Sequence, residues 1–493
     1  MKAIAERRKP SSAAADLPGV FDQSGSIRNI RRLIWLYLLL LVFEGAFRKW
    51  IVPQLSAPLL LVRDPVVILI YLCAFRARLF PYNAYVITLV IIAIASWATG
   101  IIVLLPYFPI QTIILVTGYG MRSDFLHLPL IFIIPAVFDF EDVKRVGRWT
   151  IVGVIPMALL MAMQFAASPE AFINRVAGAG EGTQLGAGGG KIRPPGVFSF
   201  VSGTVYYASA TAAFLLHTVI ARLSFKAWLL YGSGAALIIA LGVSGSRSAI
   251  LAVVVVVASL GVILLVRASL VNKFGRHLLL AVAVLWAISY LPIFQEGLGI
   301  LSDRFTESAD EVSVVGGLVG RTVGGFTEGL LVINRVPLGG YGLGVGTSGG
   351  ASFLTGQASF LLAENEWSRI LLESGPILGI AFLIWRCAIA FKLALFSIRQ
   401  VRAGNTLPLF LFSAGIFILL QGPFGQPTSL GFAVVFAGLC LAARAVDPAE
   451  VEPEASVDDA GEPAPRVMRR SRYAERLHGS ISRSHPGHGP FDR

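Results

Sequence analysis

Hydrophobic residues in this chain are concentrated in long, nearly uninterrupted blocks separated by polar stretches. Each block is roughly 15–25 residues long, the length of helix that crosses about 30 Å of hydrocarbon. A membrane β-barrel would instead alternate apolar and polar positions along each strand. The pattern therefore predicts an all-α, polytopic membrane protein with about twelve transmembrane helices. We expect these near residues 33–50, 58–75, 84–105, 125–138, 149–167, 198–221, 227–243, 248–266, 277–292, 368–396, 407–422 and 428–444.

The composition agrees with a membrane protein. Of 493 residues, 55% are hydrophobic and 14% are charged, and the mean hydropathy is +0.73; soluble domains carry about 25% charged residues. The net charge of +12 does not indicate a nucleic-acid partner, because Lys and Arg lie mainly at the chain ends and in short loops. All three cysteines lie in apolar blocks, which indicates neither a disulfide framework nor a thiolate metal site.

Charge also predicts the domain organisation. Residues 1–30 and 446–493 are polar, and we expect both to be disordered. The transmembrane domain would occupy 31–445, and its segment 107–120 could be re-entrant or interfacial. The positive-inside rule places both termini in the cytoplasm. The basic loops assigned to the same side are those around Arg76, Lys144, Arg222, Lys273 and Arg399.

One long polar segment, 293–367, interrupts the apolar pattern and should face the opposite side of the membrane. Connections of more than about 12–15 residues are usually functional or disordered. This loop carries Arg321, a glycine run at 339–350 and the cluster Glu364-Asn365-Glu366. An arginine fork suits phosphate oxygens, and a carboxylate can act as a general base. The alternatives are a solvated arginine and acids at a helix N-terminus, with Asn365 as its cap.

Three further arginines are candidates for binding an anion. Arg247 lies in a Gly- and Ser-rich turn between two spans, where it binds phosphate or extends to the membrane interface. Arg193 precedes a span on the same side and is either another anion contact or an interfacial anchor. Arg63 lies inside the second span and needs a partner. Glu44 and Arg48 are spaced to pair on the first helix, in a structural network of charges.

The sequence does not indicate a metal site or a nucleotide-binding phosphate loop. Three histidines lie at or within spans and three lie in the tail, and no Asp/His cluster has metal-ligand spacing. The glycine run lacks the Lys-Ser/Thr ending of a phosphate loop, so it favours close backbone approach to a substrate or a helix. We therefore predict no metal and no cofactor.

Several motifs together resemble the bacterial O-antigen ligase and O-antigen polymerase superfamily. The resemblance covers roughly residues 190–380, and the many-span plan with one large outer loop extends it over most of the chain. The matching elements are Arg193-Pro-Pro-Gly-Val-Phe198, Ser244-Gly-Ser-Arg247, Arg321, the run Gly339–Gly346, Glu364-Asn365-Glu366-Trp367 and Leu371–Gly379.

The resemblance implies a metal-independent, inverting glycosyltransferase at the periplasmic face of the bacterial inner membrane. Its donor would be an undecaprenyl-diphosphate-linked oligosaccharide, and its acceptor a glycan or a lipid. Arg247 and Arg321 would hold the diphosphate, and Glu364 would be the base, with Arg193, Arg63, Asn365 and Glu366 around the substrate. The family's ligases usually carry a histidine where this chain has Glu364, which favours a capsule or exopolysaccharide polymerase. The alternatives are a flippase of the lipid-linked glycan and a non-catalytic membrane scaffold.

Overall fold

The computed structural model describes residues 18–178, 184–221, 223–267, 290–299, 324–357 and 361–444. Within these ranges the chain is mostly helical, and its strands are β1 (Gly186–Gly188) and β2 (Lys191–Ile192), which form an antiparallel hairpin. The α-helices are α1 (Pro18–Ala46), α2 (Ser56–Leu59), α3 (Arg63–Arg76), α4 (Ala84–Leu104), α5 (Ile110–Met121), α6 (Leu130–Val137), α7 (Phe140–Ala166), α8 (Val201–Ile220), α9 (Ala227–Val243), α10 (Arg247–Val266), α14 (Ser348–Thr355), α15 (Glu366–Arg402), α16 (Leu407–Gln421) and α17 (Pro427–Ala442).

In the part of the chain that the structure describes, six helical segments are long and apolar enough to cross a membrane. Helices α9, α16 and α17 are also apolar but shorter. These lengths support a helical membrane protein; twelve spans remain a prediction. The six segments are Pro53–Arg76, Ala84–Leu104, Ile110–Val137, Phe140–Ala166, Arg247–Val266 and Glu366–Arg402.

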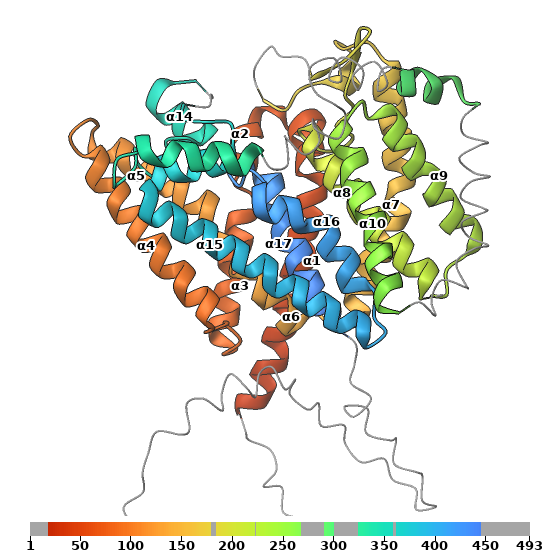
Figure 1. Cartoon of the computed structure of the whole chain (residues 1–493), viewed down its shortest axis with the longest axis horizontal. Coiled ribbons are helices and arrows are strands. Elements are labelled where there is room, and N and C mark those ends of the chain that lie inside the picture. Colours follow the sequence, from red (N-terminus) through yellow and green to blue (C-terminus); the bar gives the residue numbers. More distant parts are fainter. Residues whose placement is uncertain are drawn as a thin grey trace, which may run out of the picture.

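The helices form one bundle with two distinct edges (Figure 1). Helix α1 begins at the lower edge of the view, and the β-hairpin and α14 lie at the upper edge. Helix α16 packs against α8, α15 and α17, and α7 packs against α8 and α9. Small residues allow these close contacts: a Cβ at Gly415 would lie 2.6 Å from the Cβ of Phe436.

Two helices begin earlier than the apolar blocks predict. Helix α1 begins at Pro18, inside the segment 1–30 that was expected to be disordered, and its buried residues include Ile30 and Ile34. Helix α7 begins at Phe140, where Asp139 forms a capping box with Asp142. Lys144 and its basic neighbours therefore lie on the first turns of α7 and not in a loop.

The short span expected at 125–138 is the second half of a longer element. Helices α5 and α6 are joined through a π-helical turn, η3 (Arg122–Leu126), into one candidate span of 28 residues. Most of segment 107–120, expected to be re-entrant or interfacial, forms α5, the first part of this candidate span. The span expected at 277–292 lies almost entirely outside the described residues.

Helix α15 contains a sharp break at Gly375 (φ 76°, ψ 172°), which is followed by Pro376. The break folds the first arm, 366–374, back along the second: Cα of Leu371 would lie 3.1 Å from a Cβ at Gly379. The backbone of the loop before α15 fills the space at the break, because a Cβ at Gly375 would collide with the carbonyl oxygen of Leu338. Only the second arm of α15 is therefore long enough to cross a membrane.

Candidate functional site

The structure brings together the segments that carry Arg193 and Arg247. Gly245 has φ +54°, and a Cβ there would lie 3.7 Å from Cγ of Arg193. The Arg193 Nε group donates a hydrogen bond to the Gly186 carbonyl at 3.0 Å, which ties its guanidinium to the β-hairpin. Arg247 is the first residue of α10 and is half-buried. Arg321, its expected partner, lies outside the described residues.

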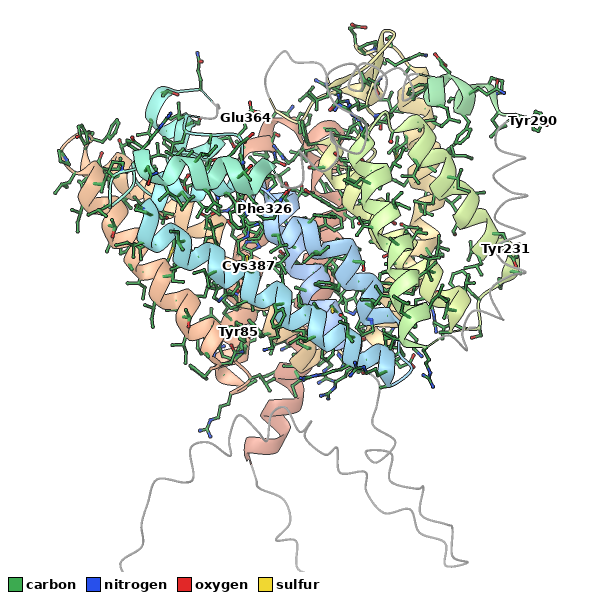
Figure 2. All side chains as sticks on the ribbon, viewed as in Figure 1. Tyr85, Tyr231, Tyr290, Phe326, Glu364 and Cys387 are labelled. Atoms are coloured by element: carbon green, nitrogen blue, oxygen red, sulfur yellow. The ribbon has the colours of Figure 1, made fainter. Side chains whose placement is uncertain are left out.

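Glu364 is exposed and lies at the same edge of the bundle as the β-hairpin (Figures 1 and 2). Asn365, the next residue, is the N-cap of α15, as predicted: its side-chain oxygen accepts from the Trp367 N–H at 3.0 Å. Its amide nitrogen donates to the Gly325 carbonyl at 2.8 Å and to Glu328 at 3.1 Å. These contacts give Asn365 a positioning role, because they anchor the helical segment 324–332 to α15 beside Glu364.

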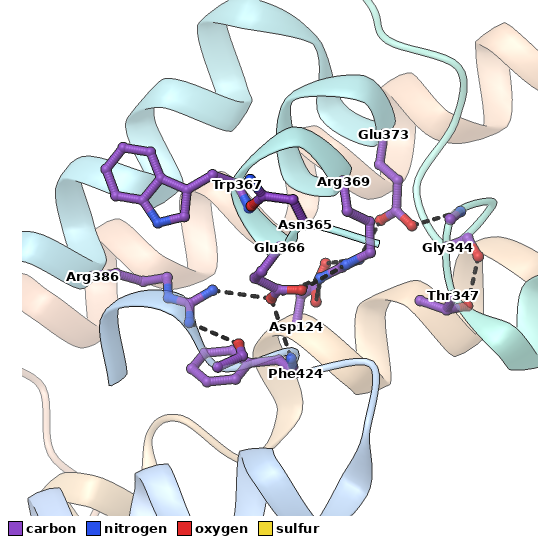
Figure 3. Close-up of polar contacts among 12 residues, drawn as sticks. Asp124, Gly344, Thr347, Asn365, Glu366, Trp367, Arg369, Glu373, Arg386 and Phe424 are labelled. Carbon is purple, nitrogen blue, oxygen red and sulfur yellow. Dashed lines mark hydrogen bonds and ion pairs between the residues drawn. The ribbon is translucent and has the colours of Figure 1, made fainter. Parts of the chain in front are cut away.

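Glu366 does not face the surface, and its expected place around the substrate stays a prediction. The side chain is buried, at 3% exposure. Its carboxylate binds Arg369 at 2.9 Å, Arg386 at 3.0 Å and the Phe424 N–H at 3.1 Å (Figure 3). A carboxylate held by three donors is satisfied inside the protein, and here it joins both arms of α15 to the 422–426 turn.

Arg369 is the centre of this buried network (Figure 3). It binds Asp124 of η3 at 2.6 Å and Glu373 at 2.8 Å, in addition to Glu366. Arg386 completes the network, donating to the Leu419 and Gly422 carbonyls with its guanidinium 3.8 Å from the centroid of the Phe424 ring. Three carboxylates thus surround two guanidinium groups. All five groups can be buried because each of them lies against a group of opposite charge.

The glycine run packs against this network. Glu373 accepts a hydrogen bond from the Gly346 N–H at 2.7 Å, and Tyr341 donates its N–H to the Leu372 carbonyl at 2.7 Å. Gly344 has φ +91°, and a Cβ there would collide with the Val116 carbonyl oxygen. The expectation that these glycines allow close backbone approach is confirmed, and the neighbours are the first arm of α15 and helix α5.

A second charged cluster lies where α1, α3 and α17 meet. Arg63 is buried at 1% exposure, and its Nε lies 3.3 Å from Glu44. A Cβ at Gly431 of α17 would collide with its guanidinium. Glu44 also lies 3.5 Å from Arg48, as the four-residue spacing predicts. Arg63 is therefore part of a structural network that helices enclose, and its expected contact with substrate stays a prediction.

Asp64 contacts a different set of residues from the adjacent Arg63. It accepts from Nε of Arg122 at 2.6 Å and lies 2.9 Å from Nε2 of His127. The other ring nitrogen of His127 shares a hydrogen bond of 3.0 Å with Tyr37. These contacts hold α3, η3 and α1 together, as expected for ionisable groups inside a span.

Beyond the pair of Glu44 and Arg48, the sequence indicated no role for residues 43–50, yet they support the Arg193–Phe198 motif. A Cβ at Gly45 would collide with the backbone of Ser199. Arg48 donates to the Ser199 hydroxyl at 3.1 Å, and Lys49 donates to the Gly196 carbonyl at 2.6 Å while 1% exposed. The signal was present, because charges inside an apolar block are costly unless they have a function or a partner.

The second cluster carries an excess of positive charge. Its three guanidinium groups outnumber its two carboxylates, and this leaves a positive potential near the segment that carries Arg193. The cluster consists of Arg48, Arg63 and Arg122, with Glu44 and Asp64.

Among the described residues, no group of three or more His, Cys, Asp or Glu side chains is placed to hold a metal ion. No model of a known protein family matches the sequence, and no curated protein matches it. A function can therefore be inferred only from the motifs of this chain and from their geometry.

Proposed function

We propose that this chain is an integral-membrane glycosyltransferase of the O-antigen ligase and polymerase type, acting on undecaprenyl-diphosphate-linked glycans at the outer face of the inner membrane. One observation carries the proposal. The end of α1 and the turn before Arg247 each pack against the segment that carries Arg193. This assembly lies at the edge of the bundle that presents Glu364 (Figure 2).

The proposed reaction displaces the lipid diphosphate from the sugar. An acceptor hydroxyl attacks the anomeric carbon with inversion, while the bond between that carbon and the diphosphate oxygen breaks. Glu364 accepts the proton from the attacking hydroxyl. The guanidinium groups of Arg247 and Arg321 stabilise the charge that develops on the departing diphosphate, and Arg193 adds an outer contact.

The buried clusters have a supporting role in this proposal. The network around Arg369 fixes the first arm of α15, and Glu364 lies two residues before that arm. The excess of cations around Arg63 adds a positive potential that favours a diphosphate over a neutral sugar. The full topology we propose has twelve spans, both termini in the cytoplasm and residues 293–367 in the periplasm.

The proposal is tested by reconstitution. The full chain in proteoliposomes receives a defined undecaprenyl-diphosphate oligosaccharide, and products are scored for chain growth, for transfer to an added lipid acceptor, and for exchange between leaflets. Chain growth supports a polymerase, and transfer to the lipid supports a ligase. Leaflet exchange without covalent product supports a flippase and contradicts the proposal. Loss of function on deleting 446–493 alone favours a scaffold.

A further inference from the structure

A cavity of about 60 Å³ lies between α7, α8 and the start of α16. Helix α7 begins here and α8 ends here, so the cavity lies at the edge of the bundle opposite the β-hairpin and α14 (Figure 1). Arg31 of α1 lies 3.3 Å from Asp142 of α7, so this part of α1 lies near the same edge. The volume exceeds that needed for one water molecule. This cavity belongs to neither charged cluster described above.

The lining of the cavity is cationic and polar on one side. Lys144 and Arg148 of α7 line it, together with His217 of α8. Lys144 forms an ion pair with Glu141, an exposed residue of the first turn of α7. Arg148 is exposed, and an arginine in this position presents several donors to an oxyanion.

His217 provides an independent indication of a ligand. It is 4% exposed, and its Nδ1 shares a hydrogen bond of 3.0 Å with the hydroxyl of Thr406. Its Nε2 has no hydrogen-bond partner among the described residues. A buried ring nitrogen without a partner is costly, and an acceptor oxygen in the cavity would satisfy it when that nitrogen carries the proton.

We propose that this cavity binds a phosphate group, with the Arg148 guanidinium and the Lys144 ammonium as cationic contacts and His217 Nε2–H as the inner donor. The phosphate can belong to the headgroup of an anionic phospholipid or to a free phosphate compound. The apolar walls formed by Ile151 and Phe214 suit a group whose remainder extends into lipid. The proposal is independent of glycosyl transfer, since it concerns the opposite edge of the bundle.

The test uses purified, delipidated full-length protein in neutral detergent. Binding of phosphatidylglycerol is measured by native mass spectrometry, and binding of inorganic phosphate by phosphorus NMR titration. Arg148→Met should weaken binding about ten-fold, the loss typical of one charge-assisted hydrogen bond. Arg76→Met is the matched control, because Arg76 is an exposed arginine at the end of α3 and does not line the cavity.

A third variant separates the cavity from general attraction to positive charge. Ser224 lines the cavity and is exposed, so Ser224→Trp should block its entrance without changing any charge. Binding of phosphatidylglycerol that both Arg148→Met and Ser224→Trp weaken identifies a lipid headgroup site. The same pattern with inorganic phosphate alone identifies a free phosphate ligand. Binding that is unchanged by Ser224→Trp, or is weakened equally by Arg76→Met, overturns the proposal.

Discussion

The carboxylate of Glu366 and the guanidinium of Arg386 lie 3.0 Å apart although twenty residues separate them within α15. In a straight helix that separation would place their Cα atoms about 30 Å apart. The contact exists because the chain reverses at Gly375 and lays the first arm of the helix along the second. Broken helices inside membrane proteins occur where backbone lines a cavity or is buried in protein, and here exposed Glu364 lies two residues before Glu366, which the reversal brings into a buried ion network.

Replacing Gly375 should disrupt this reversal. Gly375→Ala introduces a Cβ at φ +76° that collides with the Leu338 carbonyl, so we expect a loss of several kcal/mol in the free energy of unfolding. Gly356→Ala is the matched control, because Gly356 has φ +78° and no atom within 4 Å of its would-be Cβ. The control should lose only the roughly 1–2 kcal/mol of left-handed strain. Denaturant titration in mixed micelles measures both, and equal losses would show that the packing at Gly375 is unimportant.

The buried network should respond unequally to the loss of its cations and its acids. Arg369→Met leaves three carboxylates facing Arg386 alone, and removing one partner from a buried ion pair costs about 3–5 kcal/mol. Asp124→Asn keeps an oxygen that can accept from Arg369 and removes one excess negative charge, so its cost should be smaller. Thermal unfolding of the purified variants gives the order. Arg402→Met, an exposed change at the end of the same helix, should be nearly neutral.

Helix α1 supplies a further prediction about the Arg193 segment. Gly45→Ala forces the end of α1 away from Ser199, with which its Cβ would collide, and should lower both stability and chain growth in the reconstituted assay. Gly25→Ala changes a glycine of the same helix that has no atom within 4 Å of its would-be Cβ. That control should be neutral or gain up to about 1 kcal/mol of helix stability. Unchanged activity in Gly45→Ala would show that the end of α1 does not support the proposed site.

The boundaries of helices were predicted correctly from the sequence where an apolar block is flanked directly by polar residues. Helix α9 spans Ala227–Val243, as expected, because Lys226 and the Gly- and Ser-rich turn bound its block. Helix α7 was placed too late because its first turns are charged and its beginning is set by a cap at Asp139 rather than by hydropathy.

The site was predictable only in its local contacts. Spacing on one helix indicated the pair of Glu44 and Arg48, and Asn365 followed a known capping preference. The contact between Asp124 and Arg369 joins positions 245 residues apart, and no local pattern encodes it. The burial of Glu366 depends on the reversal at Gly375. From the sequence alone, an acid at the start of a helix is expected to be exposed.

Glu364 is predicted to be needed for turnover and not for folding. Because its side chain is exposed, Glu364→Gln should insert and fold normally, retain binding of the lipid-linked donor, and lower chain growth by about 10²–10⁴-fold, the usual contribution of a general base. Glu328→Gln is the matched control: it removes an exposed charge near Asn365 and keeps an acceptor for the Asn365 amide. Normal turnover in Glu364→Gln would remove this residue from the mechanism.

Arg247 should matter through its planar fork as well as its charge. Arg247→Ala is expected to lower chain growth by at least about 10²-fold through loss of charge stabilisation on the leaving diphosphate. Arg247→Lys should recover only part of that loss, because a lysine cannot bind two oxygens side by side. Arg335→Ala, an exposed arginine of the same polar region, controls for net charge.

The Arg193 segment packs against the turn before Arg247, so we expect that the effects of replacing the two arginines will not be independent. Arg193→Ala alone should lower chain growth less than Arg247→Ala, because its Nε is already bound to the Gly186 carbonyl. The double variant should then lose less activity than the product of the two single losses. Rates of chain growth for the four proteins, measured at equal amounts of inserted protein, give the coupling. A strictly multiplicative loss would mean that the two side chains act on different parts of the substrate, and the proposed convergence on one diphosphate would fail.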